Sequence, residues 1–192
     1  MNWLSFIPYA LITTFTPGPN NILSLSNATQ HGIRRALPFC LGVWAGFSIT
    51  IQLCALLSAG LNAILPSIKT PMLFIGAGYL LYLAWKTYRS GAVREKETAA
   101  SGFLTGFLMQ FVNIKGIIYG IVSMETFILP YYHNQYPAVL GLGFLLSTLC
   151  FISTVSWAAF GSVFKLLFSK YRKTVNVILA LLLVYCAVSL FL

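Results

Sequence analysis

Residues 16–21 read TPGPNN and interrupt an apolar segment that otherwise has the composition of a membrane helix. Proline removes a backbone donor and costs roughly 3 kcal/mol inside a helix. Lipid supplies no water to the carbonyl groups that such a break leaves unpaired. Interrupted membrane helices persist where the opened backbone lines a cavity or a ligand site, so this stretch predicts a polar site within the first helix.

The composition of the whole chain indicates a membrane protein. Of its 192 residues, 58% are hydrophobic and 8% are charged, whereas soluble domains have about 25% charged residues. The N-terminal stretch lacks a basic segment and is too long for a signal sequence, so we expect it to be the first span. We predict an all-α integral membrane protein with six transmembrane helices of adequate length, at 3–27, 37–61, 71–88, 103–130, 138–168 and 175–192.

Basic residues predict the orientation of these six spans. Lys69 falls on one side and Lys115 inside the fourth span, and the other basic residues share the opposite side: Arg34, Arg35, Lys86, Arg89, Arg94, Lys96, Lys165, Lys170, Arg172 and Lys173. By the positive-inside rule that side is cytoplasmic, so both termini lie outside, in the periplasm. The net charge of +9 is then a consequence of topology and does not indicate nucleic-acid binding.

The two halves of the chain show a weak internal repeat. Each half begins with an interrupted helix, at TPGPNN and at the NIKG of residues 113–116, and residues 76–84 resemble residues 180–187. Because each half has an odd number of spans, the second half crosses the membrane in the opposite orientation to the first. Secondary transporters use such inverted repeats for alternating access. We therefore predict one transporter domain over 1–192, with inverted repeats at about 1–89 and 102–192 and a cytoplasmic linker at about 90–101.

Helical rise brings the two breaks to a similar depth. Pro17 lies roughly 21 Å from the outer side and Asn113 about 16 Å from the inner side, at about 1.5 Å per residue. The helix must restart after Pro19, which leaves the backbone N–H groups of residues 20–23 unpaired at the positive end of a short dipole. Such donors form a carboxylate site. The predicted substrate-binding residues are Pro17, Gly18, Pro19, Asn20, Asn21, Asn113 and Lys115.

Lys115 is the basic residue predicted deepest in the membrane, where a charge costs about 2.5 to 3.5 kcal/mol on insertion scales. One interpretation is that it extends toward the cytoplasm or caps carbonyls freed by the break. The other, which we favour, is that it holds a substrate carboxylate or exchanges a proton during transport. Glu125, expected nearer the outer rim, and His31 are the other candidates for proton coupling. Gln52, Gln110, Thr14 and Asn27 line a pathway or bond between helices.

An enzyme is the rival class of protein, and the chain has little to support catalysis. It contains three acidic residues and two histidines, and the predicted topology puts His31 inside and His133 outside. They cannot share a metal or a catalytic dyad, so we expect no metal, no cofactor and no enzyme activity. A membrane assembly subunit that does not transport remains an alternative, although it would not require two interrupted helices.

The chain resembles the LysE/RhtB family of amino-acid exporters at TPGPNN, at the NIK of residues 113–115 and at the GYLLYLAWK of residues 78–86. Residues 110–115 and 179–188 are most similar to the branch that exports cysteine and O-acetylserine. The resemblance implies a bacterial inner-membrane exporter of small neutral amino acids, driven by the proton gradient. Export of homoserine or threonine is the alternative within the family, and a homo-oligomer stays open. Ile114 stands where many members have proline, which bears on how sharply the fourth helix bends.

Overall fold

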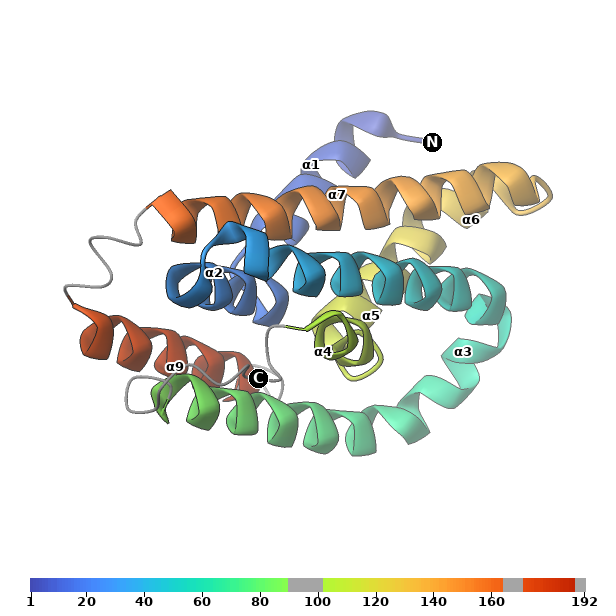
Figure 1. The fold of residues 1–192 in the computed structure, drawn as a ribbon. Coiled ribbons are helices and arrows are strands. Elements are labelled where there is room, and N and C mark those ends of the chain that lie inside the picture. The colour runs from blue at the N-terminus through green and yellow to red at the C-terminus, as the bar shows by residue number, and fades with distance from the viewer. Residues whose placement is uncertain (90–101, 164–170, 189–192) are drawn as a thin grey trace.

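The computed structural model describes residues 1–89, 102–163 and 171–188, and every regular element in these ranges is a helix. The predicted all-α class is therefore confirmed, while the predicted linker at 90–101 lies outside the described residues. Figure 1 shows α7, α9 and both arms of α3 running along one common direction. The elements are α1 Trp3–Phe15, α2 Pro19–His31, α3 Ile33–Arg89, α4 Phe103–Met109, α5 Ile114–Val122, the π-helix η2 Ser123–Ile128, α6 Leu129–Tyr132, α7 Tyr136–Val163 and α9 Arg172–Val188.

Helix α3 differs from the prediction. The spans expected at 37–61 and 71–88 are arms of one 57-residue helix, and the backbone of residues 62–70 is helical where a loop was expected. A straight helix of that length would extend about 85 Å, far more than the roughly 30 Å of a bilayer core. Figure 1 shows that α3 instead curves back on itself, so that its second arm returns toward the end of the molecule where the first arm began.

Membrane-spanning potential is concentrated in three parts of the described chain. The stretch Ile33–Leu57 of α3 and helix α7 are each long and apolar enough to cross a membrane. A third span results when Phe103–Met109 and Ile114–Tyr132, which meet at a bend of 58°, are counted as one broken helix. Helices α1 and α9 are apolar but shorter. The described residues thus support a helical membrane protein with two or three clear spans.

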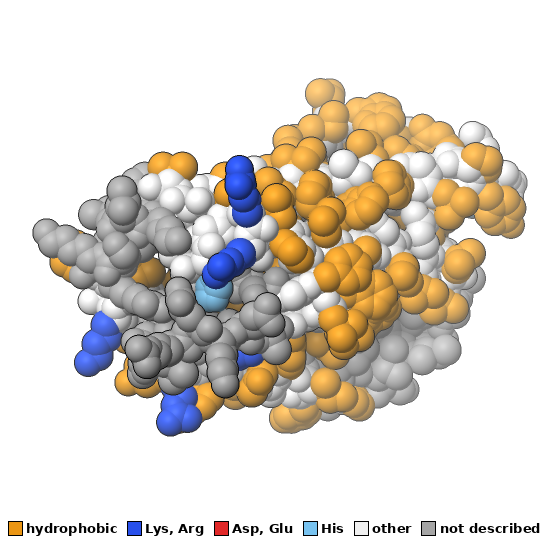
Figure 2. All heavy atoms as spheres, viewed as in Figure 1, with side chains coloured by type: hydrophobic (Ala, Val, Ile, Leu, Met, Phe, Trp, Pro, Cys, Tyr) orange, Lys and Arg blue, Asp and Glu red, His pale blue; other side chains and the backbone are white. Residues whose placement is uncertain are grey.

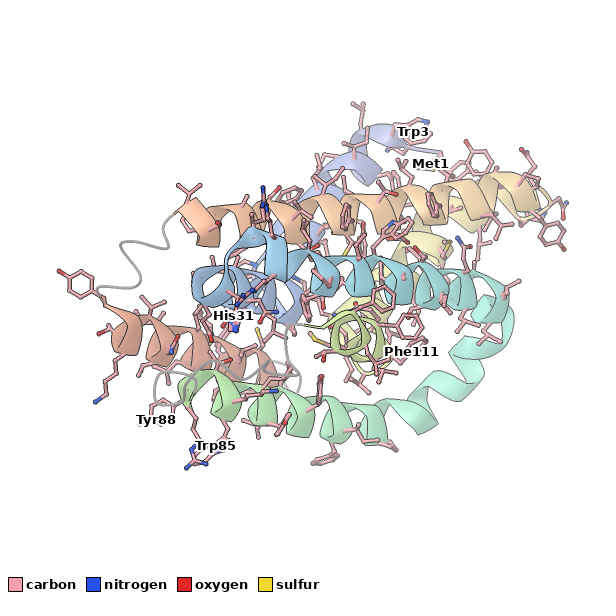
Figure 3. All side chains as sticks on the ribbon, in the orientation of Figure 1. Met1, Trp3, His31, Trp85, Tyr88 and Phe111 are labelled. Atoms are coloured by element: carbon pink, nitrogen blue, oxygen red, sulfur yellow. The ribbon has the colours of Figure 1, made fainter. Side chains whose placement is uncertain are left out.

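Glycines bring α3 and α4 into close contact. A Cβ atom on Gly46 would lie 2.5 Å from the carbonyl oxygen of Phe107, and one on Gly106 would overlap the carbonyl oxygen of Phe39. Such contacts let helix backbones approach where lipid offers no hydrophobic drive for association. Side chains fill the space between the ribbons (Figure 3). The interrupted fourth helix is thereby held firmly against α3.

Candidate functional site

The first helix breaks at residues 16–18. Helix α1 ends at Phe15, Gly18 is extended with φ −161° and ψ 175°, and Pro19 is the first residue of α2. Proline suits this position because its missing N–H would have no partner there and its φ fits the helix. Ile22 N–H donates to the Gly18 carbonyl at 2.9 Å. The unpaired N–H groups predicted at residues 20–23 are therefore limited to those of Asn20 and Asn21.

The carbonyl groups exposed by this break accept hydrogen bonds from other helices. Asn21 Nδ2 and Ser153 Oγ donate to the Thr14 carbonyl at 2.9 and 3.0 Å, and the indole N–H of Trp157 donates to the Phe15 carbonyl at 3.3 Å. Ser153 and Trp157 lie one turn apart on one face of α7. Neither was identified from the sequence, although two polar groups at this spacing in an apolar span are the signal that would have found them.

Lys115 completes the set of donors at the break. It comes from α5, and its Nζ donates to the carbonyl of Thr16 at 3.0 Å and to that of Pro17 at 3.4 Å. The half-buried ammonium thus lies at the negative, C-terminal end of α1, where a cation is favoured. A Cβ atom on Gly18 would lie 3.0 Å from both Cδ and Nζ of Lys115. Glycine at this position therefore leaves space for the lysine.

The fourth helix breaks at residues 110–113, slightly before the NIKG stretch that was predicted. Helix α5 begins at Ile114, and the Asn113 side chain caps it by accepting a hydrogen bond from Gly116 N–H at 3.4 Å. Asparagine is a preferred residue at this cap. The helix thus bends by 58° without proline at position 114, because the cap and the preceding turn stop the helix before the first residue of α5.

A cluster of side-chain amides joins the two breaks. Asn20 Nδ2 donates to Gln110 Oε1 at 3.0 Å, and Gln110 Nε2 donates back to Asn20 Oδ1 at 3.1 Å. Asn113 Nδ2 also donates to Asn20 Oδ1, at 3.2 Å. Gln110 is 1% exposed. The interpretation of Gln110 as a bond between helices is therefore confirmed, and the amide of Asn20 holds the two broken helices together.

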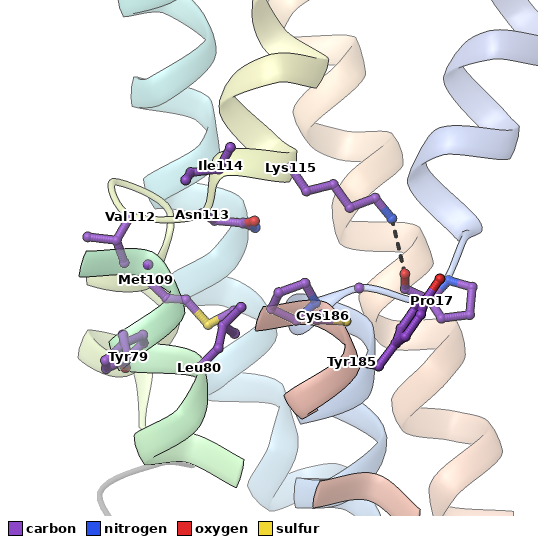
Figure 4. A pocket seen from close by; sticks show the side chains of 13 residues that line it. Pro17, Tyr79, Leu80, Met109, Val112, Asn113, Ile114, Lys115, Tyr185 and Cys186 are labelled. Carbon is purple, nitrogen blue, oxygen red and sulfur yellow. Dashed lines mark hydrogen bonds between the residues drawn. The ribbon is translucent and has the colours of Figure 1, made fainter. Parts of the chain in front are cut away.

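Two adjoining cavities meet at Lys115. The larger, of about 80 Å³, is lined by α2, α3, α4, α5 and α9 and by the break before α2, and the smaller, of about 40 Å³, lies among α1, α2, α3, α5 and α7. Gly18, Pro19, Asn113 and Lys115 line both. Figure 4 shows the Lys115 side chain crossing the top of the larger cavity toward the carbonyl of Pro17. Among the described residues that line them, none is acidic.

The structure brings together most of the residues that the sequence singled out. Pro17, Gly18, Pro19, Asn113 and Lys115 line the larger cavity, and the smaller cavity adds Asn20 and Asn21. Glu125, half-buried in the π-helix η2, and His31, at the end of α2, line neither cavity. That these cavities bind substrate, and that any of these groups carries a proton, stay predictions.

Known proteins resemble the chain over nearly its full length. Residues 11–192 match the family described as LysE type translocator. Proteins named cysteine/O-acetylserine efflux protein from Salmonella typhi and Escherichia coli UTI89 are 44% and 42% identical to it over 188 residues, which cover 97% of this chain and 96% of each relative. The protein of that name from Salmonella typhimurium is 43% identical over the same shares. No solved structure matches it significantly.

The helical apolar fold and these matches together define a membrane transport protein and not an enzyme. The chain belongs to the LysE type translocator family, as the resemblance of its motifs implied. Membership identifies it as a multi-pass protein of the inner membrane.

Proposed function

We propose that the protein exports small neutral amino acids of the cysteine and O-acetylserine kind by proton-driven alternating access. The names of its relatives support the substrate class. The observation that carries the proposal is the meeting of Lys115 with the break of the first helix at the edge of an 80 Å³ cavity. Lys115 and the start of α2 at Gly18 and Pro19 line this cavity, and Asn20 and Asn21 line the smaller cavity beside it. The other walls of the larger cavity are largely apolar.

The proposed site binds the carboxylate of the substrate. The Lys115 ammonium donates to two neutral carbonyl groups. A carboxylate is a stronger partner, because the attraction between opposite charges adds to the hydrogen bond. The N–H groups of Asn20 and Asn21 complete the anion site at the start of α2. The amides of Asn20, Asn21 and Asn113 hold the broken helices in place and contact the carboxylate or the ammonium when the site is occupied.

The size and charge of the cavities support small neutral substrates. At about 10 to 15 Å³ for each water molecule, the larger cavity has room for about five to eight of them. That is the scale of an amino acid such as cysteine, which has seven non-hydrogen atoms. A substrate with a cationic side chain would meet Lys115 and, among the described lining residues, no carboxylate. Burying such a charge without a partner is costly, so we expect lysine and arginine to be excluded.

The proposed transport cycle uses the two halves of the chain. We infer six crossings, formed by α1 with α2, the two arms of α3, α4 with α5, α7 and α9, in inverted repeats at about 1–89 and 102–192. Figure 2 shows Lys and Arg side chains gathered toward the end of the molecule where α2 passes into α3. This supports a cytoplasmic location for that end and an outer location for both termini. Rocking of one half against the other would then open the site to each side in turn.

The proton gradient would supply the energy for export. A charge that crosses a potential of 100 mV contributes about 2.3 kcal/mol. Lys115, Glu125 and His31 are the proposed proton carriers, and we favour Lys115 because it alone of the three lines the cavities. Export driven by inward proton movement requires the carrier to take up its proton on the outer side and to release it on the inner side.

Transport in proteoliposomes tests the proposal. Wild-type protein should drive cysteine and O-acetylserine uptake when a pH gradient is imposed, and Lys115→Met should lose this uptake while remaining folded. Lys173→Met is the matched control, because Lys173 is exposed at the start of α9 and should leave transport unchanged. If only homoserine or threonine is transported, the substrate is that of the alternative exporters within the family and not cysteine or O-acetylserine. If the protein shows counterflow of none of the amino acids tested, the alternative of a non-transporting membrane assembly subunit is favoured.

A further inference from the structure

We propose that Leu80, Met109 and Cys186 form the pocket for the substrate side chain, and that Met109 sets the largest side chain that the protein accepts. This inference rests on the proposed function, because it takes the carboxylate of the substrate to lie at Lys115. It adds the residues that distinguish one neutral amino acid from another, which the motifs of the sequence leave undefined.

The larger cavity has two unlike ends. Lys115, Asn113 and the backbone at Gly18 form its polar end. The opposite wall consists of Leu80 from α3, Met109 from α4 and Cys186 from α9, which are 5%, 1% and 8% exposed. Figure 4 shows the sulfur of Met109 beside Leu80 below Asn113, and Cys186 farther along the same cavity, toward Pro17. A substrate anchored at the polar end therefore has this wall as the apolar surface available to its side chain.

Other apolar residues that line the cavity are less suited to this role. Tyr185 is 66% exposed and contributes to the edge of the cavity. Figure 4 shows Val112 directed away from the space between Lys115 and Met109. Tyr79 is half-buried, and its ring stacks against Tyr82 on the same helix. Ile114 is 6% exposed, but Figure 4 shows it directed away from that space, and the buried Pro19 belongs to the helix break. Leu80, Met109 and Cys186 are thus the remaining buried apolar side chains of the lining.

Met109 has the properties expected of a residue that limits the size of the substrate side chain. It belongs both to the lining of the cavity and to a continuous apolar core that includes Leu80, Leu83 and Cys186. Its flexible side chain fits irregular spaces and adapts to different neighbours, including sulfur and ester groups. Shortening it to alanine removes three non-hydrogen atoms from the wall, and the space they leave adjoins the cavity. A substrate with a longer side chain can then enter.

Counterflow in proteoliposomes with cysteine, O-acetylserine, leucine and methionine tests the pocket. Met109→Ala should raise the rate for leucine and methionine relative to cysteine by at least tenfold. Leu83→Ala is the matched control, since Leu83 is 1% exposed in the same core and does not line the cavity. Leu83→Ala creates space in the core away from the cavity. The rates for leucine and methionine relative to cysteine should therefore stay as in the wild type. An equal change in both variants would refute the pocket.

A second variant changes another residue of the proposed pocket and does not depend on the folding of Met109→Ala. Cys186→Leu enlarges the side chain that α9 contributes to the pocket, and it should reduce O-acetylserine transport at least fivefold more than cysteine transport. Wild-type selectivity in this variant would overturn the inference. A wild-type protein that moves none of the four amino acids would instead refute the proposed function, so the two failures are distinguishable.

Discussion

Replacing Gly18 by alanine should reduce transport without destabilising the protein. The backbone at Gly18 is extended, with φ −161°, a conformation that any residue adopts. The added Cβ atom would lie 3.0 Å from Cδ and Nζ of Lys115, so the flexible end of the lysine must move by a few tenths of an ångström. Reduced freedom of the unfolded chain favours alanine over glycine by about 0.4 to 1 kcal/mol. We therefore expect stability equal to or slightly above that of the wild type.

The effect on transport follows from the hydrogen bonds of Lys115. Its Nζ lies 3.0 Å from the Thr16 carbonyl and 3.4 Å from that of Pro17, so the longer bond is lost first when the lysine moves. Hydrogen bonds to charged groups contribute about 1.5 to 3 kcal/mol. The same movement displaces the ammonium from the proposed carboxylate position, and a loss of about 1 to 1.4 kcal/mol in that bond corresponds to about a five- to tenfold decrease in substrate affinity. Gradient-driven cysteine uptake over a concentration series measures it as a rise in the half-saturating concentration.

Gly46→Ala is the control for a glycine that is required by packing. Its Cβ atom would lie 2.5 Å from the backbone oxygen of Phe107, which cannot move as the end of a lysine can. This variant should unfold at a lower temperature, whereas Gly18→Ala should not. Unchanged half-saturation in Gly18→Ala would show that the position of Lys115 against the break does not matter for binding, and the reasoning would fail.

Two further predictions concern the helix breaks. Ser153→Ala and Trp157→Phe each remove one donor to the first break and should lower the free energy of unfolding by about 0.6 to 1.7 kcal/mol, measured by thermal unfolding in detergent. Ser147→Ala is their control, because its hydroxyl bonds only within its own helix in the described structure, and a loss as large there would contradict the role of the donors. Asn113→Ala should cost about 1 kcal/mol through the lost cap and slow transport. Asn113→Asp keeps the cap acceptor but loses the donor to Asn20, so it should recover only the stability that the cap contributes. Its charge competes with the substrate for Lys115, so rapid uptake by this variant would be evidence against the anion site.

Local signals in the sequence predicted the helix breaks and the residues around them. Proline and glycine at positions 17–19 and asparagine at position 113 act on the backbone next to them, so their effect needs no knowledge of the rest of the fold. The bonds that Asn20 makes to Gln110, and that Ser153 makes to the first break, join segments 90 or more residues apart. No pattern along the chain specifies such pairs, which depend on how the helices pack.

The prediction for α3 was wrong for a different reason. The residues between its arms include Pro66 and Pro71, which are typical of a loop, and Lys69, which suits the membrane surface. The backbone there is nevertheless helical, and the helix accommodates the prolines within a curved segment. Composition therefore located the first apolar arm, at Ile33–Leu57, while the form of the connection to the second arm depended on the tertiary structure.

The reciprocal amide pair between Asn20 and Gln110 has a consequence for repeated movement. Separating an ion pair in surroundings of low dielectric constant leaves two isolated charges, whereas separating two neutral amides leaves only dipoles. The same partners can part and meet again many times with a modest barrier. In the proposed transport cycle, the hydrogen bonds between Asn20 and Gln110 would therefore break and re-form in each turnover.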